Sequence, residues 1–331
     1  MADDRRSVTT VQSVMAVEQA APQRSSILVS GEFPDRRGLL VLAAVLGGFL
    51  LTVVWSAPFV DDTVGDNVAN TLLGHDAAAT PISGIAAGVL FAFVTGLAGS
   101  FTACNIAALS AVAPLLGAGS SRWERLRYTL VPLGWLSVGM LAVSATYGAV
   151  VALVGTRMPQ FSTERAGGGR LSPPLIQAMV VFGVVGLALL YLGLIALGLT
   201  KDPFARISAR FPMAPMLIIG VLIGGFLIGR PFPLFRELFR DAANSGNPLY
   251  GAAAFSLQSI GNIVVIAGLF VLITVLIGGR AQRWLGENPR RAAAVTGVSL
   301  LAAAAFLLLY WDVRLLNAVE IISGYPLAPW V

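Results

Sequence analysis

The sequence predicts an all-α polytopic membrane protein, and two observations on its composition and patterning favour that class. Of its 331 residues, 56% are hydrophobic and only 12% are charged, and the mean hydropathy is +0.79. Soluble domains carry about twice that share of charge, roughly 25%. Several apolar runs approach the ~20 residues that a spanning helix needs, and no shorter segments alternate apolar and polar as membrane β-strands do. This composition excludes a soluble globular enzyme, a disordered protein and a nucleic-acid binder.

The apolar runs divide the chain into a tail, an anchor and a core. Residues 1–37 are polar and hold five arginines, which is typical of a disordered cytoplasmic tail. Residues 38–57 form the first apolar run. We interpret it as an uncleaved anchor helix, because it exceeds the 7–15 apolar residues of a signal peptide and follows a long polar region. Residues 58–82 are acidic, lack Arg and Lys, and are expected to form an external loop.

Six further spans are expected in the core, residues 83–311, and they bring the predicted total to seven transmembrane helices. They cover residues 83–117, 129–154, 174–199, 214–229, 250–279 and 292–311. Residues 312–331 would then form a C-terminal tail, in which Tyr325 and Trp330 could anchor at the membrane interface.

The distribution of basic residues predicts the orientation. With the N-terminal tail inside, alternate loops on that side hold 15 Arg and Lys residues, and the opposite side holds 7. Because basic residues are in excess in cytoplasmic loops, the sequence predicts a multi-pass protein of the cell membrane. Residue 20 would be cytoplasmic, and residues 65, 165 and 325 would be external. The net charge of +5 is explained by this excess and does not indicate a nucleic-acid partner.

Two of the core spans contain residues that interrupt helices. The run 83–117 is too long for one straight span and contains Gly96, Gly99 and Pro114. The short run 214–229 stops at Arg230-Pro231-Phe232-Pro233, where two prolines remove backbone donors and fix φ. We expect a helix break at this point; alternatively, the span simply ends at Gly229. The two interrupted segments fall at matching positions in two halves of the core, which is the sequence pattern of a midplane site in inverted-repeat carriers.

Small polar residues are the other candidates for a site, because the six core spans hold no Asp, Glu or Lys to mark a proton path. Ser100 and Asn105 lie in the first core span. Gln258 and Asn262 lie in the fifth, four residues apart on one helical face. These side chains could line a substrate path. Alternatively they could join helices by hydrogen bonds of ~0.6 kcal/mol each.

Cysteine and histidine are each present once, as Cys104 and His75. A disulfide within the chain is therefore impossible, and a lone histidine makes a poor metal site. We find no haem, metal or nucleotide motif, and so expect no cofactor. A lone buried cysteine is most often a small hydrophobic residue, so packing is one interpretation of Cys104.

Two stretches resemble the CcdA/DsbD-type transmembrane family, the membrane reductant carriers of cytochrome c biogenesis. The first is the run from Gly96 through Ser100-Phe101 and Cys104 to Pro114, which is similar to the family's first span. Ala103 stands where the family has proline. The second is 220–250, which resembles the fourth span, a glycine-rich helix leading into a Pro-Cys turn. Here Pro233 or its neighbour takes the place of the second cysteine.

The resemblance implies two inverted three-helix repeats, with the anchor helix as an addition. It also implies that Cys104 transfers electrons by thiol–disulfide exchange, with a thioredoxin-like or cytochrome c maturation protein as partner. One cysteine forms a mixed disulfide but cannot resolve it, so a partner or a second copy would supply the other thiol. Two alternatives remain open: a small-solute or ion transporter on the same fold, and a non-redox scaffold for membrane redox proteins. Whether the protein is an enzyme is left open by its sequence.

Overall fold

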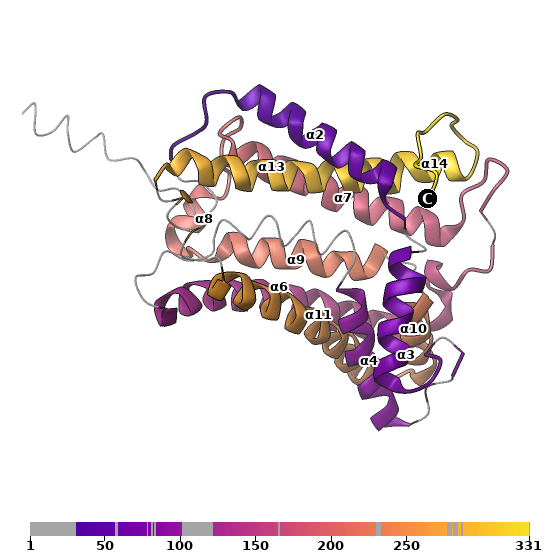
Figure 1. The fold of residues 1–331 in the computed structure, drawn as a ribbon. Helices are drawn as coiled ribbons and strands as arrows, with labels where there is room; N and C mark the ends of the chain where they lie inside the picture. Colours follow the sequence, from indigo (N-terminus) through magenta and orange to yellow (C-terminus); the bar gives the residue numbers. More distant parts are fainter. Residues whose placement is uncertain are drawn as a thin grey trace, which may run out of the picture.

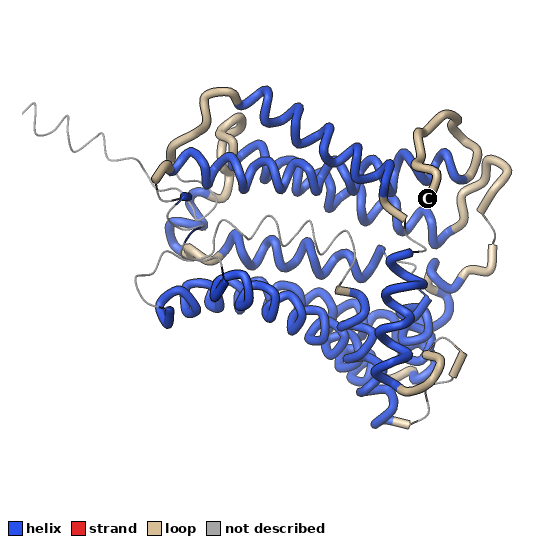
Figure 2. Tube along the Cα trace, in the orientation of Figure 1, coloured by secondary structure: helices blue, strands red, loops and turns tan. Residues whose placement is uncertain are grey.

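The structure is a computed structural model that describes most of the chain from residue 31 onwards. The described residues are 31–56, 59–77, 79–80, 82, 84–100, 122–164, 166–229, 233–276, 280, 284–285 and 287–330. Within these ranges the regular structure is helical and no strand forms (Figure 2). Five helices there are long and apolar enough to cross a membrane, and a sixth span results if a bent helix pair is counted as one. The all-α membrane class is therefore confirmed for this part of the chain.

The helices follow the predicted spans closely. In chain order they are α2 (Arg37–Val54), η1 (Phe59–Gly65), α3 (Asp66–Leu73), α4 (Ile85–Gly99), α6 (Arg122–Val154), η3 (Gly155–Arg157), η4 (Pro159–Phe161), α7 (Pro173–Ala196), α8 (Ala205–Arg210), α9 (Ala214–Gly229), α10 (Pro233–Ser245), α11 (Pro248–Leu276), α13 (Pro289–Leu307), η5 (Leu308–Arg314) and α14 (Leu315–Ala318). The first core span is described only as far as residue 100, so the count of seven spans stays a prediction.

Two segments are more helical than expected. The acidic segment 58–82, expected to be a loop, contains the π-helix η1 and the helix α3, which ends at the left-handed Gly74. The last span does not stop at residue 311. It continues through the π-helix η5 to Ala318, because the sequence after 311 holds no glycine or proline until Gly324. Asp312 therefore lies within a long helical run that could span a membrane, although no acidic residue was expected in the core spans.

The long helices form two layers (Figure 1). Helices α2, α13 and α7 lie side by side in one layer, and α9, α6 and α11 in the other, while α7 also packs on α9. The buried core between the layers is apolar and includes Phe182, Met216 and Leu300, each with 0% exposure. Helix α4 packs on α11, and α10 packs across α6, α11 and α4.

Glycines allow these helices to approach closely, as small residues do in membrane bundles. Gly148 of α6 and Gly251 of α11 face each other, and a Cβ on either would overlap the carbonyl group of the other. A Cβ on Gly220 of α9 would likewise overlap the backbone of Leu136 in α6. Gly193 of α7 has no room for one either, because a Cβ there would come 2.7 Å from Leu301 of α13.

The anchor helix α2 is part of this folded body. Its Gly48 packs against α13, and its C-terminal end is bound by residues near the end of the chain. Arg314 donates to the carbonyl oxygens of Thr52 and Trp55, at 2.6 and 3.0 Å. The Trp330 indole donates to the carbonyl of Val54 at 3.2 Å. These bonds satisfy carbonyl groups that have no partner inside a helix end.

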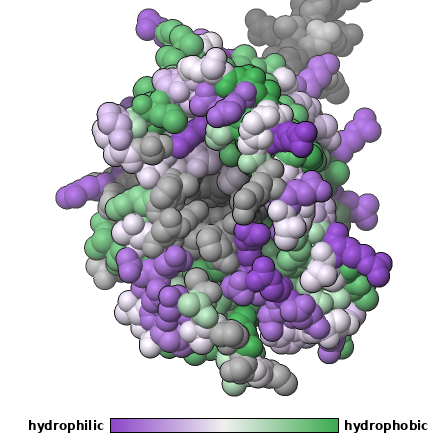
Figure 3. Space-filling view, turned by 90° about the vertical axis from the view of Figure 1, so that its right-hand side faces the viewer, coloured by the Kyte–Doolittle hydropathy of each residue, from purple (hydrophilic) through white to green (hydrophobic). Residues whose placement is uncertain are grey.

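Figure 3 shows the end of the molecule toward which α2, α6 and α13 run. Hydrophilic side chains are spread over this end of the described surface. The sides of the bundle differ: large apolar residues there are widely exposed, such as Leu50 of α2, Val184 of α7 and Val264 of α11. Polar ends and apolar sides are the distribution that a bilayer-spanning bundle requires.

Candidate functional site

The structure describes only some of the candidate residues predicted from sequence. Those described are Gly96, Gly99, Ser100, Gln258 and Asn262, and Pro233 is the first residue of α10. Cys104, Asn105, Pro114, Arg230 and Pro231 lie outside the described residues. The geometry below therefore concerns the segments on either side of those positions.

The candidate residues of the first core span meet those of the fifth where α4 crosses α11. A Cβ on Gly96 would overlap the carbonyl oxygen of Gln258 and lie 3.1 Å from the amide nitrogen of Asn262. From the other side, a Cβ on Gly261 would overlap the carbonyl of Phe93. We call this contact the α4–α11 crossing. The polar residues predicted on two distant spans are thus brought together by backbone contact.

Hydroxyl groups surround the crossing. Ser100 donates to the carbonyl of Gly96 at 3.0 Å and lies 3.5 Å from the carbonyl of Asn262. Next to Gln258, the hydroxyl of Ser259 shares a hydrogen bond with Ser144 of α6. These side chains lie between α4, α6 and α11, and they are small polar residues in otherwise apolar helices.

Gln258 is the least satisfied member of this group. The residue is 3% exposed, and its side-chain oxygen Oε1 has no hydrogen-bond partner among the described residues. Leaving a buried acceptor unpaired costs about 1–3 kcal/mol. An acceptor placed in this way could receive a hydrogen bond from a substrate, as the substrate-path interpretation requires; Gln160 Nε2 and Gln177 Oε1 lack partners in the same way.

The two interrupted segments also come together. Helix α9 ends at Gly229 and α10 begins at Pro233, with an angle of 86° between the two helices. Residues 230–232, where the helix break was predicted, lie outside the described residues. Helix α10 then returns to α4, where a Cβ on Gly99 would come 2.7 Å from the ring of Phe235. Within the described residues, the last turn of α4 therefore touches the first turn of α10.

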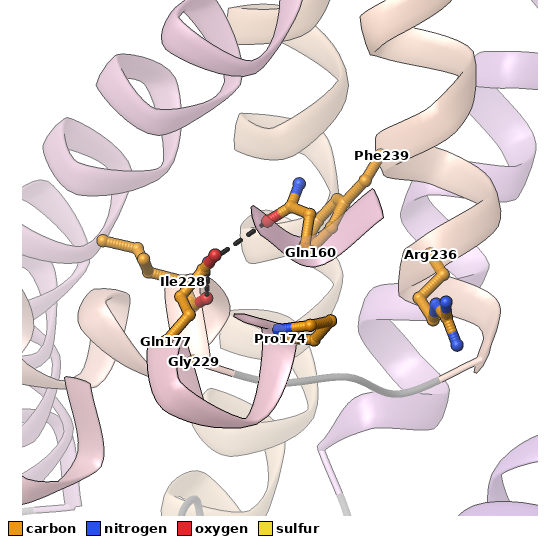
Figure 4. Close-up of a pocket in the computed structure, with 7 residues that line it drawn as sticks. All are labelled: Gln160, Pro174, Gln177, Ile228, Gly229, Arg236 and Phe239. Carbon is orange, nitrogen blue, oxygen red and sulfur yellow. Dashed lines mark hydrogen bonds between the residues drawn. The ribbon is translucent and has the colours of Figure 1, made fainter. Parts of the chain in front are cut away.

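A second polar group lies at the end of α9 (Figure 4). The Gln177 amide of α7 donates to the carbonyl oxygens of Ile228, at 2.7 Å, and of the Gln160 side chain, at 3.2 Å. Tyr147 of α6 also donates to Gln160. A small pocket beside them has a volume of about 10 Å³, room for about one water molecule. Its lining comprises Gln160, Pro174, Gln177, Ile228, Gly229, Arg236 and Phe239.

The sequence did not predict this second group, because its members come from four separate segments, α6, η4, α7 and α9. Gln177 was the available signal, since it is a polar residue in the first turns of an apolar span. Its role follows from the break: α9 stops at Gly229, and the carbonyl of Ile228 needs a donor from elsewhere. A broken helix is tolerated at membrane depth only where such donors exist.

Acidic residues make no cluster near either group. Within the described ranges, no three His, Cys, Asp or Glu residues are placed to hold a metal ion. Asp312 in η5 stands apart. Its carboxylate faces Gly183 of α7, where a Cβ would lie 3.4 Å from either oxygen, and no described residue bonds to its Oδ2.

The fold and these polar groups define the class: the chain is a polytopic helical membrane protein. Comparison with family models, with curated proteins and with solved structures gives no match. The functional assignment therefore depends on the site geometry and on the sequence.

Proposed function

We propose that the protein is a membrane carrier built from two inverted three-helix units, with its site where the two interrupted segments meet. The observation that carries this proposal is the contact of Gly99 with Phe235, about one turn of α4 from the contact of Gly96 with the buried Gln258. In inverted-repeat carriers, broken helices at matching positions in the two halves line the binding site. Helices α4, α6 and α7 would form the first unit, and α9, α11 and α13 the second.

The pairing of helices supports an inverted repeat. Along the α4–α11 contact, Gly88 meets Tyr250 and Gly96 meets Gln258, so the two helices are parallel. The α6–α9 pair is also parallel, since Leu136 meets Gly220 and Val143 meets Gly224. The first helix of each unit thus packs, in the same sense, on the second helix of the other.

The third helices of the two units pack on each other in the opposite sense. Gly186 of α7 meets Leu308, directly after α13, and Gly193 meets Leu301. The residue numbers rise in one helix and fall in the other, so this pair is antiparallel. Units related by a two-fold axis in the membrane plane give antiparallel pairs of equivalent helices.

The first candidate cargo is a pair of electrons carried by thiol–disulfide exchange. The Cys104 thiolate would attack a disulfide of an external partner, forming a mixed disulfide and releasing the partner's other sulfur as a thiolate. A dithiol donor protein would then attack the Cys104 sulfur and free the first partner in its reduced form. The donor's second thiol would release Cys104, so the donor is oxidised and the acceptor reduced. Gly96 and Ser100, which lie at the α4–α11 crossing, precede Cys104 in the sequence by eight and four residues.

Paired substitutions of Cys104 test the redox cargo. We expect Cys104→Ser and Cys104→Ala to abolish maturation of external thiols, measured in whole cells by trapping mixed disulfides on gels, while both proteins insert at the normal level. A thioredoxin-like protein should be trapped with the wild-type chain only. A fully active Cys104→Ala protein would exclude electron transfer by this residue.

The second candidate cargo is a small polar solute, and the unpaired carbonyl of Gln258 favours it. A solute that donates a hydrogen bond would satisfy this acceptor, which no side chain of the described residues does. In proteoliposomes loaded with candidate solutes, Gln258→Leu should then abolish uptake, while Cys104→Ala should transport normally. If neither variant affects transport or thiol maturation, the scaffold alternative is favoured over both carriers.

A further inference from the structure

An apolar groove lies at the end of the bundle opposite to the one shown in Figure 3, where α8 lies between α7 and α9 in the chain (Figure 1). Its volume is about 330 Å³, and it is open on one side. The lining residues are Trp135, Ile207, Arg210, Phe211, Pro212, Met213, Ala214 and Leu217. Trp135 belongs to the apolar span that begins at Thr129, so the groove runs from the end of the bundle into the membrane-facing part of α6.

The groove exposes large apolar side chains. Trp135 is 45% exposed, Ile207 50% and Phe211 61%. Helix α8 separates this open side from a buried one, because Ser208, on its other face, is only 3% exposed. A surface of this size and polarity, at the edge of a spanning helix, suits a hydrocarbon chain.

Positive charge collects at the same place. Arg210 lines the groove and stacks on the Phe211 ring at 5.9 Å, and Lys201 and Arg206 lie on the same short segment. Among the described residues, none of these three cations has an ion pair. The segment's one acidic residue, Asp202, accepts a hydrogen bond from the backbone amide of Phe204 at 2.8 Å. With three cations and one carboxylate, the segment 201–210 carries a net charge of +2, and Arg210 brings one of these cations to the groove itself.

We infer that this groove binds an anionic phospholipid, with an acyl chain against Trp135 and Phe211 and the headgroup phosphate at Arg210. The charge complementarity selects this occupant over a neutral lipid, since basic pockets at the ends of spanning helices recognise anionic headgroups. A guanidinium group can also form two parallel hydrogen bonds to one phosphate, so Arg210 would add a specific polar contact to the apolar groove. This inference is independent of the cargo proposed above.

Native mass spectrometry of the full chain tests the inference. The protein would be released from bilayers of equal parts phosphatidylglycerol and phosphatidylcholine, and the retained lipids counted. We expect the wild type to retain phosphatidylglycerol, and Arg210→Gln to retain about fivefold less, the effect of one cation near an anionic headgroup. Arg210→Lys should retain an intermediate amount.

Two further variants separate the groove from general surface charge. Ala214→Leu fills the groove without changing charge and should lower retention. Arg240→Gln, in α10, removes an exposed arginine paired with Glu237 and should leave retention unchanged. Size-exclusion profiles show whether each variant is folded. Equal retention of the two lipids by the wild type, or unchanged retention in folded Arg210→Gln, would overturn the inference.

Discussion

Glycine is required at positions where the backbone of a neighbouring helix occupies the place of a Cβ atom. At Gly261 a Cβ would overlap the carbonyl of Phe93, and a backbone cannot yield as the end of a flexible side chain can. Overpacking of this kind typically costs about 1–3 kcal/mol. The same helix contains a glycine without such a neighbour, Gly268, which has nothing within 4 Å of its Cβ position. The two positions separate packing from helix propensity.

We expect Gly261→Ala to destabilise the protein by about 1–3 kcal/mol, because α11 must move away from α4. Gly268→Ala should be neutral or slightly stabilising, since alanine is the better helix former. Thermal unfolding in detergent, followed by fluorescence-detected size exclusion, measures both. Equal melting temperatures for the two variants would contradict the close crossing.

Gln177 and Gln258 should respond differently to removal of their amide groups. Gln177→Leu leaves the carbonyl of Ile228 without its donor, and an unsatisfied buried group costs about 1–3 kcal/mol. Gln258→Leu removes an oxygen that already lacks a partner, so stability should change little or rise. Melting temperatures of the two variants, measured side by side, check this difference. A larger loss in Gln258→Leu would contradict the assignment of its oxygen as unpaired.

Sequence reasoning predicted some of the residues in the two polar groups described here and missed others. Gly96, Ser100, Gln258 and Asn262 could be predicted, because small polar residues stand out in apolar helices and the four-residue spacing gives their common face. That they meet across two helices depends on backbone contact, which no local pattern encodes. Gln160 lies in a short connecting helix, where a polar residue carries no signal, and so its hydrogen bonds to α6 and α7 were not foreseen.

At the scale of elements, the end of α2 depends on distant parts of the chain. Arg314 makes two charge-assisted hydrogen bonds to the carbonyls of Thr52 and Trp55, and Ala328 donates to Val53 at 3.1 Å. Hydrogen bonds to charged groups contribute about 1.5–3 kcal/mol each. The helix dipole adds to this, because a cation near a helix C-terminus is favourable.

Replacing Arg314 should therefore loosen α2 from the rest of the bundle. We expect Arg314→Gln to lower the melting temperature and to speed hydrogen exchange in the last turn of α2. Arg240→Gln is the control: its ion pair with Glu237 is exposed and should contribute only about 0–1 kcal/mol. Unchanged exchange at residues 51–55 would show that the tail does not hold the helix end.

Element boundaries could be predicted where composition changes abruptly. The two prolines near 231 give the turn after α9, and the start of α9 at Ala214 agrees with the predicted span. The helices η1 and α3 were missed because their sequence is acidic and short, and packing of α3 on α4 stabilises them instead. The extension of α13 through η5 was missed because the predicted span stopped at residue 311, where the apolar run ends and Asp312 follows.

At the scale of the whole molecule, the orientation in the membrane is a prediction from the basic residues alone. The end of the helical bundle that carries Arg206, Arg210, Arg290 and Arg291 would face the cytoplasm. In a Cys104→Ala background, single cysteines at positions 65 and 165 should react with an impermeant maleimide on intact cells. A cysteine at position 20 should react only after permeabilisation. Labelling of position 65 from the inside alone would reverse the orientation and the proposed inverted units with it.

The attachment of α2 to α13 and to the tail has a consequence for biosynthesis. A ribosome makes α2 before any of its partners, and the residues that bind its end come more than two hundred positions later. Until they emerge, the nascent helix must reside in lipid or against the insertion machinery, with its small-residue stripe around Gly48 unfilled. Chains released before α13 is made would therefore insert but lack the contacts that tie α2 to the bundle, and we expect membrane proteases to remove them.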